Sequence, residues 1–309
     1  MNETDTQKQI INISWKYNKN DGSYYPTMTL FDHASNEEQI IMLRNYNFNY
    51  MLTTERYCPG YHYLDGYHPC PYNNILNKDS YSQCFYCDKK QGFREAFLFQ
   101  GQANEFMQEY LKQKHYIYLA YFEPGIIKVG TAAESRKYLR PIEQDALVYM
   151  FIAESDGFSI QDLEHTISKE IGITEAVNSS HKFRYLNQKP NIDKAKKLLM
   201  SNFDRIHDRY KGNEKFSSWI IEKPELVDLS GFVTYPEDEV YKVKNSEIDY
   251  LIGKFHAIRG RYTIFESNNT LLAIDERKII GKYIKSYQDN YQYKVENKKS
   301  KHKDQLSMI

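Results

Sequence analysis

The feature of the sequence that most constrains its fold is the placement of its four cysteines, all of which lie between residues 58 and 87. The surrounding segment is rich in proline, glycine and asparagine, which favour turns, and has few aliphatic residues with which to build a core. A bound metal would stabilise such a segment, because the free energy of metal binding becomes free energy of folding. Four thiolates suit tetrahedral Zn²⁺, and a site with four sulfur ligands and no open position is structural. The predicted ligands of this structural zinc are Cys58, Cys70, Cys84 and Cys87.

Other interpretations of the cysteines remain open at the level of the sequence. The thiols could be unrelated and free, although all four cluster in one loop. A [4Fe–4S] cluster takes the same four ligands, and His62 or His68 could replace one cysteine. Disulfides are not expected, because the polar and acidic start of the sequence is unlike a secretory signal and predicts a cytoplasmic protein.

Composition limits the partners of the chain. The 41 Lys and Arg residues balance 41 Asp and Glu residues, so nucleic-acid binding would require a local basic patch. No apolar run approaches the ~20 residues that cross a bilayer, so no membrane contact is expected. The 28 tyrosines suit half-buried strands, and some of them could instead be stacking platforms for bases or sugars.

The middle of the chain has the clearest pattern of secondary structure. Two apolar strands, residues 116–122 and 126–130, flank the turn Glu123-Pro124-Gly125 and predict a hairpin. A polar helical stretch and a buried strand over 147–153 follow. A helix with apolar residues at helical spacing then runs from about 159 to 171, and Gly172 ends it. A second long helix follows Asn191.

These patterns predict five regions and an α+β fold. Residues 1–57 form a β-rich segment, and residues 58–100 hold the zinc. Residues 101–215 form a central α/β domain with a helical extension, and residues 216–294 form a small β module. Residues 295–309 are expected to be a disordered basic tail, because they hold little that could be buried.

The central domain also carries an ordered set of functional residue types. Ile117-Tyr118 lies in the first strand of the hairpin, and Lys128-Val129-Gly130 ends the second strand about ten residues later. An arginine follows on a short helix, either Arg136 or Arg140, and Glu164 lies on a later helix. This succession resembles the GIY-YIG nuclease-like domain. The resemblance implies a small mixed sheet flanked by helices.

The resemblance also implies metal-dependent cleavage of a phosphodiester, with a role for each residue. Glu164 would hold Mg²⁺ or Mn²⁺, and Arg136 or Arg140 would neutralise charge that develops on the phosphate. Tyr118 would orient or deprotonate the attacking water. Lys128 stands where that family has a second tyrosine; a lysine can hold phosphate and, if buried, can act as a base.

A wider succession of motifs over roughly residues 50–285 resembles a prokaryotic family labelled a domain of unknown function. Members of that family join a four-cysteine segment to a GIY-YIG-like core and a small β module, and they usually have Gly where this chain has Asp145. Gln144 lies where many GIY-YIG nucleases carry His or Tyr. The motifs are Arg56-Tyr57-Cys58-x-Gly60, Cys70-Pro71, Gln83-Cys84-x-x-Cys87, His115-x-x-Tyr118-Leu119-Ala120, Lys128-Val129-Gly130-Thr131, Glu143-Gln144-x-Ala146 and Gly253-Lys254-x-x-x-Ile258-x-Gly260-x-Tyr262.

Three functions are compatible with these residues. The favoured one is a nuclease that acts on DNA or RNA with Mg²⁺ or Mn²⁺. The second is a non-catalytic nucleic-acid-binding module in which Lys128, Arg136 and Arg140 only grip phosphates. The third is an enzyme for a small phosphorylated or nucleotide-like ligand. Basic and aromatic residues also alternate in the segment Gly253–Tyr262, which permits contact with a nucleic acid.

Overall fold

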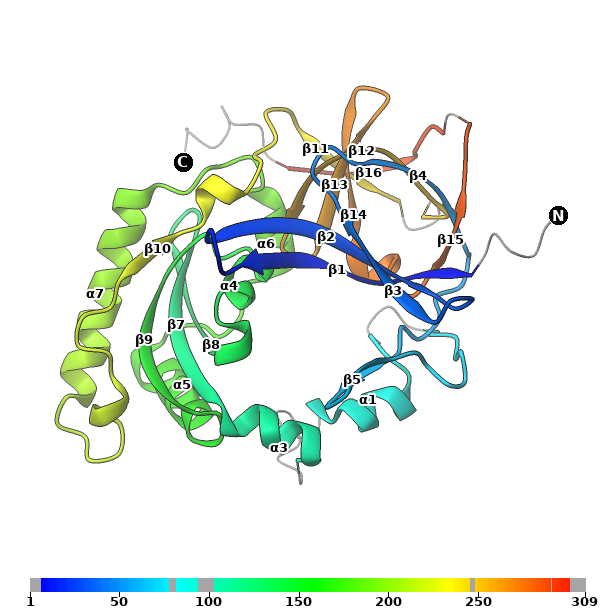
Figure 1. Ribbon diagram of the computed structural model, residues 1–309. Helices are drawn as coiled ribbons and strands as arrows, with labels where there is room; N and C mark the ends of the chain where they lie inside the picture. The colour runs from blue at the N-terminus through cyan, green and yellow to red at the C-terminus, as the bar shows by residue number, and fades with distance from the viewer. Residues whose placement is uncertain (1–6, 78–81, 94–102, 245–247, 290, 301–309) are drawn as a thin grey trace. The chain divides into compact units, whose positions relative to one another are not determined.

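The computed structural model describes residues 7–77, 82–93, 103–244, 248–289 and 291–300. The described chain divides into two compact units (Figure 1). Unit 1 draws its residues from 1–107 and 236–302, and unit 2 from 108–235. The fold is mixed α+β and rich in strands, as the sequence predicts.

Unit 1 is built on a large sheet. Within the described residues, ten strands pair in the order β16-β11-β14-β13-β12-β4-β15-β1-β2-β3, and every pairing except β11 with β14 is antiparallel. The strands are β1 (Lys8–Asn18), β2 (Ser23–Asp32), β3 (Glu37–Met42), β4 (Asn47–Leu52), β11 (Val240–Val243), β12 (Tyr250–Arg259), β13 (Tyr262–Ser267), β14 (Thr270–Asp275), β15 (Tyr283–Ser286) and β16 (Val295–Lys299). Strands from both ends of the sequence therefore share one sheet.

The end of the chain differs from the prediction of a disordered tail over residues 295–309. Strand β16 pairs with β11, and the buried Ser300 accepts a hydrogen bond on its Oγ from the backbone N–H of Val240 (2.9 Å). The Lys299 ammonium also lies 2.7 Å from the Glu239 carboxylate. Backbone pairing at a sheet edge needs little side-chain burial, which explains why composition missed this strand. Residues 301–309 lie outside the described residues.

The cysteine-containing segment of unit 1 contains only small elements. These are the hairpin of β5 (Tyr61–Tyr63) and β6 (Gly66–His68), followed by the helix α1 (Phe85–Gln91). Parts of the predicted segment 58–100, namely 78–81 and 94–100, lie outside the described residues. The helix α3 (Glu105–Lys112) follows and leads into unit 2.

Unit 2 is a four-stranded antiparallel sheet with helices against it. Its described strands pair in the order β10-β9-β7-β8. They are β7 (Lys114–Phe122), β8 (Ile126–Ala133), β9 (Val148–Asp156) and β10 (Leu226–Asp228). Strand β10 lies in the predicted β module of residues 216–294 but pairs with β9 of unit 2, and only this pairing identifies it as a strand. The helical elements are η2 (Glu134–Arg136), α4 (Leu139–Glu143), α5 (Gly157–Ile171), α6 (Ser179–Arg184) and α7 (Ile192–Tyr210).

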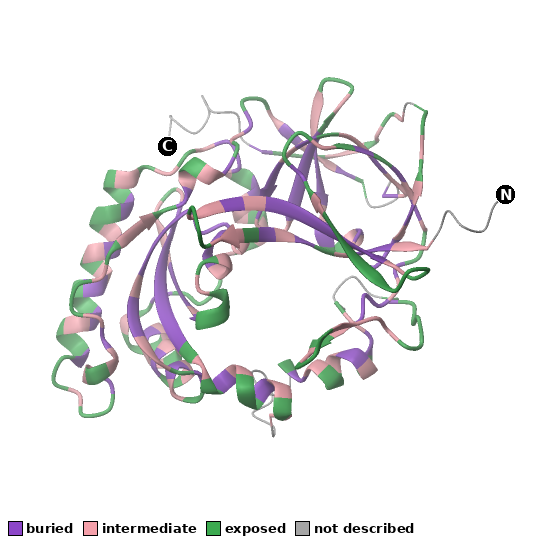
Figure 2. Ribbon diagram, viewed as in Figure 1, coloured by how far each residue is buried: buried purple, intermediate pink, exposed green. Residues whose placement is uncertain are grey.

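Helices α5 and α7 bury their apolar faces against this sheet, as Figure 2 shows by the buried stripe along each. Ile160, Leu163 and Ile167 of α5 are completely buried at the spacing of one helix face. The side chain of Asp156 caps this helix by accepting hydrogen bonds from the backbone N–H groups of two following residues. Gly172 ends it in the left-handed conformation with φ of 78°, where the sequence predicts the end.

Helices that could cross a membrane are absent from the described part of the chain.

Candidate functional site

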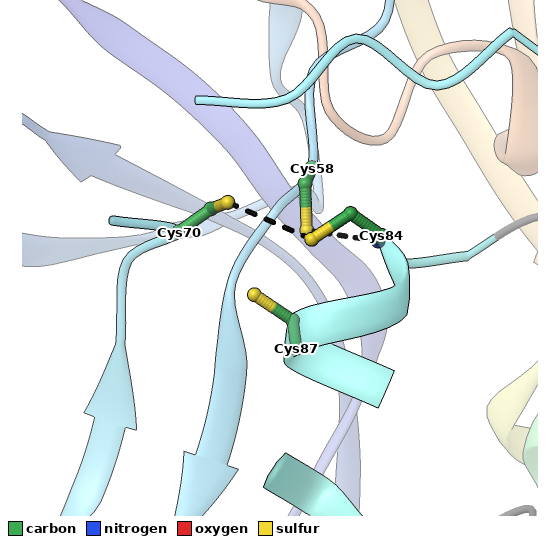
Figure 3. A group of neighbouring side chains, drawn as sticks. All are labelled: Cys58, Cys70, Cys84 and Cys87. Atoms are coloured by element: carbon green, nitrogen blue, oxygen red, sulfur yellow. Dashed lines mark hydrogen bonds between the residues drawn. The ribbon is translucent and has the colours of Figure 1, made fainter. Parts of the chain in front are cut away.

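The four cysteines converge from three parts of the folded segment (Figure 3). Cys58 precedes β5, Cys70 follows β6, and Cys84 and Cys87 lie at the cap and in the first turn of α1. All four sulfur atoms lie within 4.8 Å of one another, and the Cys70 and Cys84 sulfurs are 3.8 Å apart. A tetrahedral zinc with Zn–S bonds of ~2.3 Å places its sulfurs roughly 3.8 Å apart, so this arrangement fits a metal site.

The surroundings of the cluster favour a thiolate at Cys58, while burial and the neighbouring sulfurs raise the pKa values of Cys70 and Cys87. The pKa of Cys58 is lowered to about 5, chiefly by a hydrogen bond from the Cys87 thiol and also by the backbone N–H groups of Cys84 and Gly60. The first of these backbone groups lies 3.2 Å from the Cys58 sulfur. A sulfur–sulfur distance of 3.8 Å excludes a Cys70–Cys84 disulfide, which needs ~2.05 Å.

Histidine does not take part in the cluster. Among the described residues, the group of three or more potential ligands that could hold a metal consists of the four cysteines, without a histidine. The ring of His68 instead pairs with Asp65, at 2.7 Å from Nε2 to the carboxylate, and stacks on Tyr61. The alternative in which His62 or His68 replaces a cysteine is therefore wrong.

The cluster has little hydrophobic support of its own. Besides the cysteines, its buried apolar core consists of Leu76, with the rings of Tyr61 and Tyr86 packed against it. It is tied to the large sheet by the side chain of Gln9, whose Nε2 donates to the carbonyl of Cys58 (3.3 Å) and to that of Gly281 (3.1 Å). A metal bound by the four sulfurs would supply the stability that this small core lacks.

A second cluster of polar groups lies on the β7–β8 hairpin of unit 2. Tyr118 pairs with Gly130 across the two strands, and Lys128 is on the same face. The Tyr118 hydroxyl donates a hydrogen bond to Oε1 of Gln144 (2.8 Å), and Nζ of Lys128 lies 5.4 Å from the centre of the Tyr118 ring.

Gly130 leaves the space in which these two groups meet. A Cβ at this position would lie 2.6 Å from the Tyr118 hydroxyl oxygen and 2.7 Å from Nζ of Lys128. The phenol and the ammonium group therefore converge over a backbone position that only glycine fits without movement of its neighbours.

Glu164 approaches this cluster from α5. Its carboxylate accepts a hydrogen bond from Thr131 on β8, and the positive charges of Lys128 and Arg140 favour its ionised form. Burial acts in the opposite direction and is the largest effect, so the pKa of Glu164 is raised. The carboxylate of Glu175 adds to that increase. The cluster thus brings two carboxylates close to two cations.

Burial is also the largest effect on the pKa values of Lys128 and Tyr118. The pKa of Lys128, a residue 7 % exposed, is lowered to about 8 by burial, and Arg140 and Lys182 lower it further against the opposing effect of Glu164. The pKa of Tyr118, which is completely buried, is raised by the same cause. A substantial fraction of Lys128 is therefore neutral near pH 8.

The structure separates the two arginines that the sequence offers as alternatives. Arg136 in η2 is exposed and forms an ion pair with Glu143. Arg140 in α4 lies close enough to shift the pKa values of Tyr118, Lys128 and Glu164. Of the five predicted catalytic residues, four lie together and Arg136 lies with Glu143.

Sequence reasoning missed other members of this cluster. Glu175 follows α5 in a loop, and Lys182 in α6 donates a hydrogen bond from Nζ to the carbonyl oxygen of Gln144. Thr131 ends the motif Lys128-Val129-Gly130-Thr131 and was not given a role. Glu175 reaches the cluster because the adjacent Thr174 bridges to Lys128 at the edge of β8, a pairing that the sequence pattern does not reveal.

Asp145 takes a backbone conformation that favours glycine. Its φ is +65°, and it is buried directly after Gln144. Aspartate tolerates this left-handed region better than most residues, so it can occupy a backbone position that favours glycine.

The sequence and structure were compared with known protein families, curated proteins and solved structures. Neither a search of curated proteins nor a search of solved structures found a significant match. The family model described as Protein of unknown function (DUF2797) matches residues 83–284, which include Cys84, Cys87 and all of the Tyr118 cluster. Because this match spans more than half of the sequence, the chain belongs to the DUF2797 family.

Proposed function

We propose that unit 2 is a GIY-YIG nuclease-like domain and that the protein is a metal-dependent phosphodiesterase acting on DNA or RNA. The observation that carries this proposal is the convergence of Tyr118, Lys128, Arg140 and Glu164 around Gly130. A phenol, two cations and an acid come from four separate elements. Packing alone gives no reason to bury Lys128 and to place the partly buried Arg140 and Glu164 beside it.

The carboxylates supply the oxygen ligands for a divalent cation. Glu164 would hold Mg²⁺ or Mn²⁺, and Glu175 would add a second negative charge nearby. Such ions are bound through one or two carboxylates plus waters and substrate phosphate. When bound, the metal polarises the phosphate and stabilises the leaving oxygen. The hydrogen bond from Thr131 orients the Glu164 carboxylate.

The two basic residues, Arg140 and Lys128, have separate roles in cleavage. Arg140 binds the non-bridging oxygens of the phosphate, where a guanidinium can donate two hydrogen bonds at once. Lys128, with a pKa of about 8, is neutral in about a tenth of molecules at pH 7 and accepts a proton from the attacking water. Tyr118 is completely buried and bonded to Gln144, so it positions Lys128 and its neighbours rather than carrying a proton itself.

The four-cysteine cluster is proposed to hold structural Zn²⁺. Its sulfur spacing fits tetrahedral zinc, and four protein ligands leave no position for a substrate. A [4Fe–4S] cluster would take the same residues, and the visible absorption of the purified protein distinguishes the two.

A second candidate function is a nucleic-acid-binding module without cleavage. The observation that favours it is the complete burial of Tyr118, which keeps the phenol from a substrate. In that case Lys128 and Arg140 contact phosphates, and binding depends on salt but needs no divalent cation.

Cleavage assays decide between these functions. Labelled single- and double-stranded DNA and RNA are incubated with Mg²⁺ or Mn²⁺ and with the unmodified protein, Glu164→Gln or Glu170→Gln. Glu170 lies on the same helix but pairs with Arg209 at the surface, so it is a matched control. We expect cleavage by the unmodified protein and the control, and at least a hundredfold loss in Glu164→Gln. Salt-dependent binding without cleavage supports the binding module, and no affinity for any nucleic acid contradicts both.

A further inference from the structure

Unit 1 contains an open cleft beside the cysteine cluster. Its volume is about 520 Å³, within the range of roughly 300–1,000 Å³ typical of small-ligand sites. It involves no residue of the Tyr118 cluster and lies entirely in the other unit. The residues that matter for its chemistry are His33, Thr53, Tyr57, Cys70, Asn73 and Tyr283.

Aromatic rings form one wall of the cleft. The Tyr57 and Tyr283 rings meet edge to face with centres 5.2 Å apart. The His33 ring lies 5.3 Å from that of Tyr283. Each of the three is partly or fully exposed to solvent. Tyr283 lies in β15, His33 follows β2 and Tyr57 precedes β5. Three separate parts of unit 1 therefore position the rings.

Hydrogen-bonding groups border the rings. The Asn73 side chain accepts a hydrogen bond on Oδ1 from the Tyr283 hydroxyl (2.9 Å), which fixes its orientation, and the same amide carries two N–H donors. The sulfur of Cys70, a half-exposed acceptor, and the Thr53 hydroxyl also line the cleft. The described lining residues include no Asp, Glu, Lys or Arg. The cleft therefore suits an uncharged planar group with polar edges.

We propose that this cleft binds a nucleobase, either of a nucleic-acid strand or of a free nucleoside. A base can stack its flat face on one of these rings and meet the inclined neighbouring rings with its edge, since the Tyr57 and His33 rings are tilted by 74° and 41° from that of Tyr283. Hydrogen-bonding atoms at the base edge then face Asn73 and Cys70. That the planar ring is a nucleobase, rather than another heterocycle, rests on the proposed function. The cleft itself does not depend on the Tyr118 cluster.

The geometry also connects the cleft to the metal site. Cys70 is both a predicted metal ligand and part of the cleft wall, and the backbone N–H of Asn73 donates to its carbonyl oxygen (3.3 Å). Asn73 has φ of +44°, a conformation held by this short turn. Metal bound to Cys70 thus orders the turn that presents the Asn73 amide.

Calorimetric titration of the metal-loaded protein tests the proposal. The background variant is Glu164→Gln, so that binding is measured without cleavage. The probes are the four ribonucleosides, a short single-stranded oligonucleotide and an abasic oligonucleotide of the same length. We expect the oligonucleotide with bases to bind about tenfold more tightly than the abasic one, since base stacking on aromatic side chains contributes this much or more. Saturable binding of a free ribonucleoside would identify a free nucleoside, and not only a nucleic-acid strand, as a source of the bound base.

Substitutions in the cleft give the decisive comparison. Tyr57→Leu and Tyr283→Leu should each abolish the preference for bases, whereas Tyr283→Phe keeps the ring and should retain most of it. Tyr72→Leu is the control, because Tyr72 lies in the same segment, is 63 % exposed and does not line the cleft. Metal content and circular dichroism confirm that each variant is folded.

Two results overturn the proposal: equal binding of the base-containing and abasic probes, or unchanged base preference in both leucine variants. If the unmodified protein cleaves a nucleic acid and either of these results is found, only the proposal of base binding in the cleft is rejected. Base binding that depends on Tyr283, without cleavage of any substrate, rejects the proposed nuclease and leaves the cleft standing.

Discussion

Lys128 and Glu164 are ionisable side chains held where burial opposes their charges. Burial is the largest effect on both pKa values, lowering that of the lysine and raising that of the glutamate. Each residue therefore costs the folded state free energy that a neutral side chain of similar size would not. Residues retained at such a cost are typical of functional sites.

Replacement of Lys128 by methionine should stabilise the protein in a pH-dependent way. Below pH 8 the folded state must bury a charged lysine, and this cost disappears as the pH rises from about 8 towards the ordinary lysine value. We expect Lys128→Met to raise the free energy of unfolding by about 1–3 kcal/mol at pH 7, and by less at pH 10. Urea denaturation at both pH values measures the difference.

The exposed Lys112, which pairs with Glu109 on α3, provides the control. Lys112→Met should change stability by less than about 0.5 kcal/mol at either pH. A Lys128→Met variant that is less stable than the unmodified protein to the same extent at both pH values contradicts the buried-charge interpretation.

A methyl group at Gly130 tests the convergence of Tyr118 and Lys128 directly. Gly130→Ala places a Cβ within 2.7 Å of both side chains, and the buried phenol has little room to move. Overpacking of this kind destabilises by about 1–3 kcal/mol. Gly212→Ala is the comparison, since a Cβ there has no neighbour within 4 Å. Equal thermal stability of both variants would show that the two groups do not meet at Gly130.

At the scale of elements, local patterns predicted most of unit 2. The hairpin of β7 and β8, the strand β9 and the helices α5 and α7 follow from apolar spacing and from Gly172. Strands β10 and β16 were missed, because each is short and exists through pairing with a distant strand. The cysteine cluster was predictable, since sulfur chemistry restricts four thiols to few arrangements.

Removal of the metal should unfold the cysteine-containing segment selectively. We expect about one zinc per chain in the purified protein, and loss of most of it in Cys87→Ser. Chelation should increase amide hydrogen exchange in residues 58–77 and 82–92 and leave strands β7 to β9 protected, because the latter have their own hydrophobic core. Unchanged exchange in the cysteine segment after complete metal removal would contradict a structural role.

At the scale of the whole molecule, no sequence pattern predicts that strands from both the first and the last described parts of the chain share one sheet. Strand β15 pairs with both β1 and β4, so residues far apart in the sequence form adjacent strands. Alternation of apolar residues identifies a strand but not its partner. Likewise, Arg140 lies near Tyr118 and Arg136 does not, because of the directions that η2 and α4 take. The spacing of the two arginines in the sequence does not determine these directions.

Because the described part of unit 2 is continuous in sequence, a fragment of residues 104–235 should fold by itself. A fragment of residues 104–215 lacks β10 and the buried Phe216 and Ile220, which belong to the core beneath α5 and α7. Loss of these two side chains alone should lower the free energy of unfolding by about 3–6 kcal/mol relative to the longer fragment. Circular dichroism during thermal denaturation compares the two. If neither fragment folds, or both are equally stable, the assignment of residues 216–228 to this unit is wrong.

The pH dependence of cleavage tests the central claim most directly. With Mg²⁺ and a labelled oligonucleotide, the rate should rise with pH, reach half its maximum near pH 8 and level off about one pH unit higher, as Lys128 becomes neutral. Lys128→Arg, which stays protonated, should lose cleavage but keep binding. An absence of cleavage at every pH, or a rate that neither Lys128→Arg nor Glu164→Gln changes, would contradict a catalytic site around Gly130.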